Sequence, residues 1–323
     1  MPRLNSAGRG LSRLSQEALP VLYRHRLLTA HQMQRLLRPK LTSTRYLRDQ
    51  LHQLHNLGLA DATVRHHNRA GEHLWYITNL GCEVVESGGE TTPRAYRMSE
   101  QAAASQLQEH TIAVNETGLA FVEHARRLGD ECGPLDWDPE LSHRVRDGDS
   151  RLGDEAFLIP DAVLSYVRTQ GDERALLTFF CEIDRSTMTI ARLAGKLHAY
   201  ARYATYVPSP QAPGRRRPAR PAAFGREAWR ERYPAFPRIL LVLTGAPLHV
   251  LSKRAADLRA LATADPRLAR AADQLRAGVT TLELLQVHGP FAPIITPVLG
   301  DPAPTDVLLA AAHVSALPAL ALT

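Results

Sequence analysis

Cysteine is scarce in this sequence, and the ligand pairs of structural zinc sites are absent. The 323 residues include only three cysteines, Cys82, Cys132 and Cys181, which lie far apart. No Cys-x-x-Cys and no His-x-x-x-His pair occurs. This pattern argues against a disulfide framework and a structural zinc site, and it favours a reducing compartment. We therefore expect a cytoplasmic protein.

The sequence also lacks a long uninterrupted apolar run. The first ten residues contain no apolar segment of the kind found in signal peptides. Residues 307–323 are apolar, but His313 and Pro318 interrupt them and the stretch is short for a bilayer. We expect neither secretion nor a membrane segment. Hydrophobic residues nevertheless make up 44% of the chain, enough for a sizeable core.

Charge is distributed unevenly along the chain, whose net charge is +6. Residues 1–80 hold 12 Lys and Arg against 4 Asp and Glu, whereas residues 101–184 hold 7 against 17. Residues 185–253 are basic again, with 13 against 2. An acidic segment between two basic ones suits a metal site that also holds a polyanion. The alternative is that the charge runs are solvated surface.

The first 80 residues have the pattern of three helices followed by a hairpin. Thr29 and Gln32 have the spacing of a capping box, and Gly58 is placed to end the third helix. We expect helices at 15–26, from 29 and from 42 to 58, then strands at 59–65 and 73–78. This order is typical of a winged helix-turn-helix.

Basic side chains gather on two features of that motif. Arg45, Arg48 and His52 share the exposed face of the third helix, where they would face the major groove of DNA. Arg65 and Arg69 flank the hairpin tip, where they would approach phosphates. The alternative is a small helical domain used for protein contacts. Because both features are basic together, we favour double-stranded DNA as the partner.

Composition divides the chain into segments. Residues 87–93 are rich in Ser, Gly and Thr and indicate a linker. The predicted organisation is a DNA-binding domain at 1–92, a linker at 93–98, an α/β domain at 99–265 with a Pro/Arg-rich insertion at 207–237, and an Ala-rich extension at 266–323. We expect the extension to be helical and to pack on the core.

The second domain alternates helices and strands. We expect a helix at 99–128, strands at 140–145, 157–168 and 174–183, a helix after 184, a strand at 238–244 and a helix at 252–264. These elements predict an α/β fold with a mixed central sheet.

Three acids converge if the strands on either side of Gly171 form a tight hairpin. Opposed residues then have numbers that sum to 343, so Asp161 lies opposite Glu182, and Asp184 shares the face of Glu182. Three neighbouring carboxylates need raised pKa values or a cation, and Mg²⁺ or Mn²⁺ is the natural one. A bulge at the turn would shift the register.

The helix after these acids is basic. Lys196 and Arg192 lie with Tyr200 and Tyr203 on the side opposite an apolar stripe. Lys196 would orient water or stabilise charge on a phosphate, and Arg185 and Arg192 would contact DNA. The alternative is an amphipathic helix with a solvated polar face.

Two resemblances follow from these residues. Pro160 and Asp161 together with Glu182-Ile183-Asp184 resemble the PD-(D/E)xK nuclease core, which contains a helix, three strands, a helix and a strand. The predicted winged helix, with Cys-Glu-Ile-Asp-Arg-Ser-Thr at 181–187 and Lys-Leu-His-Ala-Tyr at 196–200, resembles the replication-relaxation family of plasmids and integrative elements. Together they imply a winged helix followed by a restriction-endonuclease-like α/β domain.

The resemblance to the nucleases implies a metal site at Asp161 and Glu182, with Asp184 as a further ligand. The nuclease pattern has lysine where this chain has Asp184. Either Lys196 supplies the cation from the helix, or the fold has lost cleavage and only binds.

The implied function is a replication-relaxation protein that nicks or relaxes plasmid DNA for replication or conjugative transfer. Its catalytic residues would be Asp161, Glu182, Asp184 and Lys196. The nucleophile would be water or a tyrosine. The alternative is a non-catalytic replication initiator or transcriptional regulator with a degenerate nuclease fold. The expected partner is duplex DNA at a plasmid or integrative-element origin, and a homodimer is one assembly that could bind it.

Overall fold

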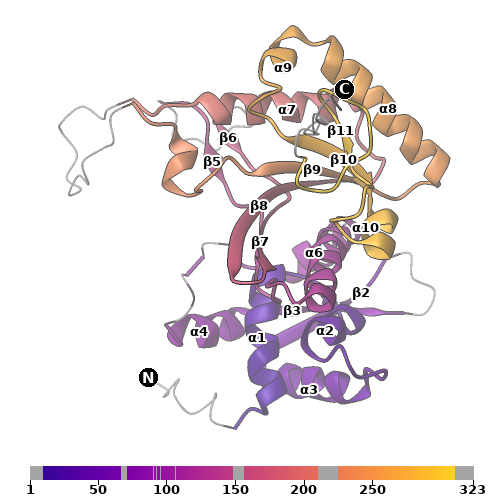
Figure 1. Cartoon of the computed structure of the whole chain (residues 1–323). Coiled ribbons are helices and arrows are strands. Elements are labelled where there is room, and N and C mark those ends of the chain that lie inside the picture. The colour runs from indigo at the N-terminus through magenta and orange to yellow at the C-terminus, as the bar shows by residue number, and fades with distance from the viewer. Residues whose placement is uncertain are drawn as a thin grey trace, which may run out of the picture.

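The computed structural model is a mixed α/β fold, which confirms the fold class expected from the sequence (Figure 1). It describes residues 10–66, 71–89, 91, 93–94, 96–105, 107–147, 156–209 and 225–309. An N-terminal group of helices lies against a six-stranded sheet, and further helices cover that sheet on both faces. No helix in these ranges is long and apolar enough to cross a membrane.

The N-terminal elements follow the predicted order. They are α1 (Arg13–His25), β1 (Leu28–Thr29), α2 (Ala30–Leu37), α3 (Arg45–Asn56), β2 (Ala60–Val64), β3 (His73–Ile77) and α4 (Asn79–Ser87). The capping box of Thr29 and Gln32 is present, and Gly58 has a φ of 69° just beyond α3. β1 joins the hairpin to give the order β1-β3-β2. The assignment of this unit as a winged helix-turn-helix stays a prediction.

The central sheet has the strand order β11-β10-β9-β8-β7-β4. These strands are β4 (Trp137–Pro139), β7 (Ala162–Gln170), β8 (Glu173–Asp184), β9 (Arg238–Leu243), β10 (Ala277–Thr281) and β11 (Thr296–Pro297). β8, β9 and β10 are parallel, whereas β4, β7 and β8 form an antiparallel meander and β11 pairs antiparallel with β10. A small separate ladder joins β5 (His143–Arg144) to β6 (Phe157–Leu158).

Helices cover both faces of this sheet (Figure 1). α6 (Gln108–Leu128) and α10 (Leu282–His288) lie on the face toward the N-terminal helices, and α7 (Ile190–Thr205), α8 (Leu248–Ala264) and α9 (Pro266–Arg270) lie on the other. Side chains of β8 alternate between the two layers: Phe179 and Cys181 join the core on the α6 side, and Phe180 joins the core on the α7 side. Glu182 therefore faces the α7 layer.

Four expected elements differ from the structure. The strand expected at 140–145 is only β5, which lies in the separate ladder, and the unexpected β4 forms the edge of the central sheet. The helix expected at 99–128 is two helices, a short α5 (Glu100–Ala103) and α6. The strand expected at 157–168 is broken before Ala162, because Pro160 cannot donate to a ladder. Between residues 266 and 309 the extension is helical only in part, since it contains α9 and α10 but also β10 and β11, which complete the central sheet. β10 pairs along its length with β9, and all five of its residues are buried.

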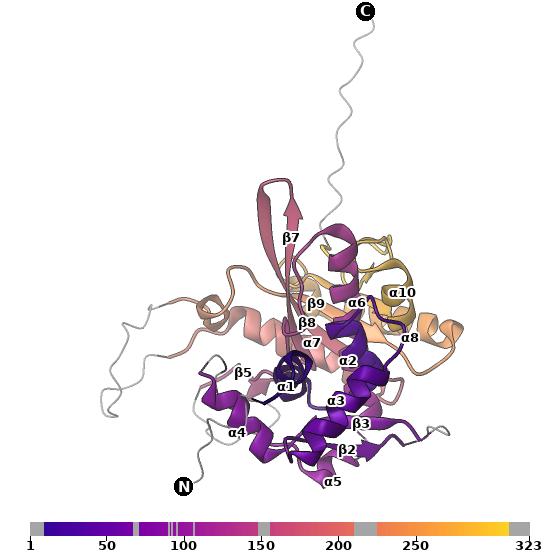
Figure 2. The same ribbon diagram turned by 90° about the horizontal axis from the view of Figure 1, so that it is seen from below.

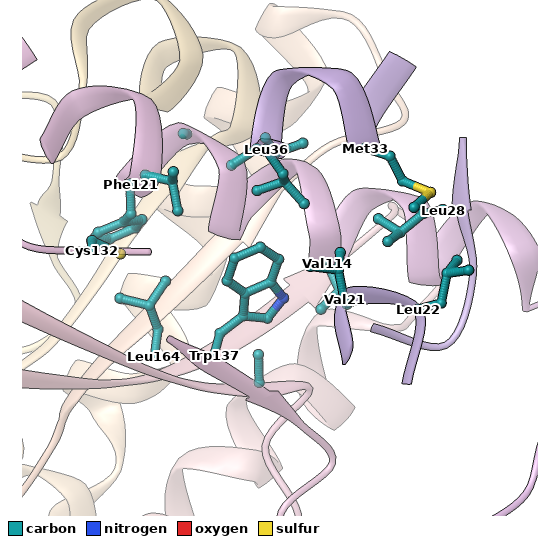
Figure 3. Packing of buried hydrophobic residues seen from close by; sticks show 14 of the residues in the cluster. Val21, Leu22, Leu28, Met33, Leu36, Val114, Phe121, Cys132, Trp137 and Leu164 are labelled. Carbon is teal, nitrogen blue, oxygen red and sulfur yellow. The ribbon is translucent and has the colours of Figure 1, made fainter. Parts of the chain in front are cut away.

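The N-terminal helices and the sheet share one hydrophobic core (Figure 3). Trp137 of β4 is almost completely buried, and its ring stacks on His25 at the end of α1 with centroids 3.8 Å apart. The His25 ring nitrogen Nε2 also contacts the carbonyl oxygen of Pro134 at 2.6 Å. Burial lowers the pKa of His25 to about 3, so the ring is neutral. The domain division at 93–98 stays a prediction, but the described parts on either side are packed together.

Gly118 of α6 is required by this packing. A Cβ atom there would lie 2.6 Å from two atoms of the Trp137 ring. Gly118→Ala should lower the free energy of unfolding by about 1–3 kcal/mol, because the indole cannot move within a close-packed core. Urea unfolding measures this change.

Gly195 of α7 gives the matched control, since it is exposed and a Cβ there would meet nothing within 4 Å. Gly195→Ala should raise the free energy of unfolding by about 0.5–1 kcal/mol through helix propensity. Equal effects of the two substitutions would contradict the close packing of Gly118 on Trp137.

Candidate functional site

The β7–β8 hairpin brings two predicted acids together. Ala162 pairs with Cys181 and Gln170 with Glu173, which confirms the expected register and the absence of a bulge. Asp161 comes directly before the first pair and so lies next to Glu182. Its Oδ2 accepts a hydrogen bond of 2.7 Å from the backbone N–H of Ile183. The ladder and this bond together fix the Asp161 carboxylate at the start of β7.

α7 supplies a lysine to both acids. Thr189 caps the helix by accepting from the backbone N–H of Arg192 at 3.3 Å. Two turns along, the Lys196 ammonium donates to Glu182 Oε2 and lies 3.8 Å from Asp161 Oδ1. Tyr200, one turn further, donates to Glu182 Oε1 at 2.6 Å. Both oxygens of the Glu182 carboxylate therefore have a partner on α7.

The Glu182 carboxyl is strongly perturbed because it is 1% exposed. Burial and the nearby Asp161 carboxylate raise its pKa to about 7, against the opposing effects of Lys196 and Tyr200. Burial disfavours the charge on Lys196, but the two carboxylates outweigh burial and raise its pKa. Near neutral pH, the cluster thus contains a charged lysine and a glutamate that is present in both its protonated and its ionised form.

Asp161 has the opposite shift. Burial disfavours its charge, but His110, Lys196 and the Ile183 N–H outweigh burial and lower its pKa. His110 comes from the first turn of α6, and its Nε2 lies 3.4 Å from Asp161 Oδ1. The sequence marks His110 only as a polar position of a helix. Only the packing of α6 beside the start of β7 reveals its place in the site.

Asp184 is held apart from the other two acids. Arg254 of α8 donates to Asp184 Oδ2 from both Nε, at 3.1 Å, and a terminal nitrogen, which also donates to the Met188 carbonyl at 2.7 Å. Asp184 Oδ1 is buried and has no hydrogen-bond partner in the described structure. The cluster is thus an acid pair with a lysine, and Asp184 belongs to a separate ion pair.

The donor atoms decide which metal site these residues fit. Across the ranges that the structure describes, no three His, Cys, Asp or Glu side chains are grouped to hold a metal ion. Asp161 and Glu182 are the acids that would hold Mg²⁺, which is often held by one or two carboxylates with the remaining positions filled by water and phosphate. The ion would have to displace Lys196 or Tyr200 from a Glu182 oxygen. The three-carboxylate arrangement does not fit, because Arg254 occupies Asp184. Binding of Mg²⁺ or Mn²⁺ itself stays a prediction.

The face of α3 is a second candidate site. Arg45, Arg48 and His52 are exposed there, and neither arginine forms an ion pair with a described residue. Arg48 and His52 line a hollow of about 470 Å³ whose other wall includes His73 and Trp75 of β3. Figure 2 shows α3 beside the β2–β3 hairpin. Helix and hairpin therefore form one continuous surface.

Both candidate sites lie within the part of the chain that matches a known family. The replication-relaxation profile covers residues 19–213, more than half of the 323 residues. The chain belongs to the replication-relaxation family. The match runs from α1 to beyond α7 and confirms the family expected from the sequence. Searches of curated proteins and of solved structures gave no match.

In this replication-relaxation protein, the arginines proposed to contact DNA differ in how available they are. Arg65 is held by two acids: its Nε lies 2.6 Å from Glu109 Oε1 and its Nη1 lies 2.8 Å from Glu72 Oε2. It therefore fixes the hairpin to α6 instead of presenting a free guanidinium. Arg69 lies outside the described residues. Arg185 is half-buried and Arg192 exposed, and neither pairs with a described acid.

The tyrosines of α7 are less accessible than expected. The prediction that Tyr200 and Tyr203 lie on the side opposite the buried stripe is wrong, since both are buried and pack near the Phe180 ring. Burial and Glu182 raise the pKa of Tyr200 well above its usual value. Burial and Asp147 raise the pKa of Tyr206 to about 12. A tyrosine nucleophile is therefore less favoured than water.

The raised pKa of Glu182 predicts a pH dependence of stability. The ordinary pKa is 4.5 and the folded value about 7. Native protein therefore binds more protons between these values, and the associated stability, complete at low pH, is lost as pH rises through 7. Relative to Glu182→Gln, wild type should lose roughly 2–3 kcal/mol of unfolding free energy between pH 4.5 and 7.

Urea unfolding at several pH values tests this linkage. Glu131→Gln is the control, because Glu131 is an exposed carboxylate that pairs with Arg174. A free-energy gap between wild type and Glu182→Gln that stays constant across this pH range would contradict the perturbed carboxyl.

Proposed function

We propose that this protein binds duplex DNA of a plasmid or integrative element and nicks it for replication or relaxation. The nicking centre would be the cluster of Asp161, Glu182 and Lys196. One observation carries this proposal: the Lys196 ammonium contacts Glu182 and lies 3.8 Å from Asp161, so a lysine from α7 reaches both acids. The chain thereby compensates for Asp184, which stands where the nuclease pattern has lysine.

The order of elements supports the same proposal. The described core runs α6, β4, β7, β8, α7 and β9. Small ladders aside, this is the order of helix, three strands, helix and strand in the PD-(D/E)xK core. Asp161 comes just before the second of these strands, and Glu182 lies near the end of the third. This order supports the proposal that the acid pair corresponds to the metal-binding acids of those nucleases.

The proposed chemistry is hydrolysis of one phosphodiester bond. Water attacks phosphorus, one ester P–O bond breaks, and the leaving oxygen takes a proton. Mg²⁺ or Mn²⁺ held by Asp161 and Glu182 would supply charge stabilisation and a more acidic water. Lys196 places positive charge beside the phosphate, and a preorganised charge of this kind contributes strongly to transition-state stabilisation. His110, whose Nε2 lies 3.4 Å from Asp161 Oδ1, would hold that carboxylate in place beside the metal.

Docking on DNA is assigned to α3. Arg45 and Arg48 lie on its exposed face, and the hairpin lies beside it. In a complex, the hairpin would contact the DNA backbone next to the groove. In this arrangement a helix enters the major groove while the hairpin lies along the phosphates. Assembly as a homodimer on an origin stays part of this proposal.

A second candidate is a non-catalytic initiator or regulator. Two contacts favour it. Lys196 and Tyr200 satisfy both Glu182 oxygens, and Arg254 neutralises Asp184. A fold without catalytic activity would also need its buried acids paired in this way, because an unpaired buried charge is strongly destabilising.

DNA docking by α3 is tested with Arg45→Gln/Arg48→Gln. The variant should bind duplex DNA at least tenfold more weakly, and the plot of log K against log salt concentration should become less steep, because two cations that displace counterions from the groove are lost. Fluorescence anisotropy at several salt concentrations measures both quantities. The control is Arg13→Gln/Arg174→Gln, which changes net charge equally at exposed arginines already paired with acids. Equal losses of affinity in both variants would argue against a specific role for α3.

Nicking is tested on a supercoiled plasmid that carries the cognate origin. Wild type should relax it in Mg²⁺ or Mn²⁺ but not in EDTA. Asp161→Asn and Lys196→Met should each slow relaxation by about 100-fold or more while leaving duplex affinity within about twofold. Glu131→Gln should relax the plasmid at the wild-type rate.

The same assay decides between the two candidates. Wild-type protein that binds the origin but leaves the plasmid supercoiled in either metal would favour the initiator or regulator. Thermal unfolding gives a further readout, since a bound ion stabilises the folded state. Under the nicking proposal, Mn²⁺ raises the melting temperature of wild type but not of Asp161→Asn.

A further inference from the structure

A basic hollow lies on the outer side of α7, away from the acid–lysine cluster. It occupies about 1050 Å³ between α7 and α9. Arg202 comes from α7, and Arg267 and Arg270 come from α9. We call this hollow the arginine cleft. All three guanidinium side chains are exposed, and α9 lies beyond the 19–213 segment that matches the family.

The arginine cleft carries positive charge that the described residues do not neutralise. Arg202 and Arg267 form no ion pair with them, and Arg270 donates only to the Pro266 carbonyl, at 3.1 Å. Asp265 is the one acid in the lining, and it is already engaged. Its carboxylate caps α9 by accepting from the Arg267 N–H at 2.8 Å, and its other oxygen lies 3.0 Å from His198 Nε2.

The chemistry of the lining indicates the ligand. Guanidinium groups match the geometry of phosphate oxygens, and three arginines from two helices suit a chain of phosphates more than a single small anion. Among the described residues, no Phe, Tyr or Trp side chain lines the cleft, and the one ring there, His198, is held by Asp265, so the lining favours phosphates over bases. We infer that the arginine cleft binds the phosphate backbone of duplex DNA without reading its sequence.

The position of the cleft indicates which DNA it takes. α3 and α9 lie at opposite ends of the molecule, with the central sheet between them (Figure 1). The cleft opens on the outer side of α7, whereas Lys196 points from the same helix toward Glu182, so a duplex that runs from α3 to the acid–lysine cluster does not lie in the cleft and we assign the cleft to a second segment. The protein would then hold two duplex segments at once. This inference rests on the proposed binding of duplex DNA by α3.

Bridging of two duplexes tests the inference directly. One duplex carrying the origin is immobilised on beads, protein is added, and capture of a second, labelled duplex of unrelated sequence is measured. Wild type should capture it. Arg202→Gln/Arg267→Gln/Arg270→Gln should still bind the first duplex but capture at least tenfold less of the second. For the binding of the second duplex by this variant, the slope of log K against log salt concentration should be smaller in magnitude by about 2–3.

The matched control is Arg13→Gln/Arg174→Gln/Arg230→Gln. It makes the same change in net charge at three exposed arginines, each paired with an acid. This control should capture the second duplex as wild type does. Both triple variants should unfold at the wild-type temperature, because all six side chains lie on the surface.

The possible results separate this inference from the proposed function. If wild type does not bind the first duplex, DNA binding itself fails. If wild type and the cleft variant both capture the second duplex equally, only the cleft inference is overturned, and bridging then comes from two α3 faces in a homodimer. Equal loss of capture in the cleft variant and the control also overturns it, because net charge alone would explain the effect.

Discussion

The buried carboxylate of Glu182 is the constraint on which this site depends. It lies in β8, at the centre of the sheet, where neither face is open to water. Removing a charge from water costs several kcal/mol unless donors replace the solvent. Lys196 and Tyr200 provide those donors from successive turns of one helix. The crossover from β8 to β9 must therefore hold α7 in one rotational setting, and the position of Lys196 beside Asp161 follows from that setting.

Local patterns in the sequence predicted the parts of the fold that local interactions determine. The capping box at Thr29 involves residues three positions apart, and the hairpin at Gly171 sets its own register through a tight turn. Because register transmits along a ladder, one turn was sufficient to place Asp161 beside Glu182. The same reasoning predicted the three N-terminal helices with their hairpin and the order β7, β8, α7 and β9, but not β1 or β4.

Contacts between distant segments were beyond that reasoning. Nothing in the spacing of Asp184 indicates that Arg254, on another helix, will neutralise it. Likewise, Glu109 of α6 captures Arg65 only because the hairpin packs on that helix. The prediction for the tyrosines of α7 was wrong for a related reason. A helical wheel orders the faces of a helix, but the aromatic layer around Phe180 decides that Tyr200 and Tyr203 turn inward.

The stacking of His25 on Trp137, with α6 pressed against the same indole at Gly118, has a geometric consequence. Because this packing joins the N-terminal helices to the sheet, the separation of α3 from the acid–lysine cluster is a fixed length of the molecule. Under the proposed function, the protein therefore cuts at a fixed distance from the sequence that it binds. The number of base pairs between the sequence it recognises and the bond it breaks is set by the packing around an indole ring, and the length of the connecting chain has no influence on it.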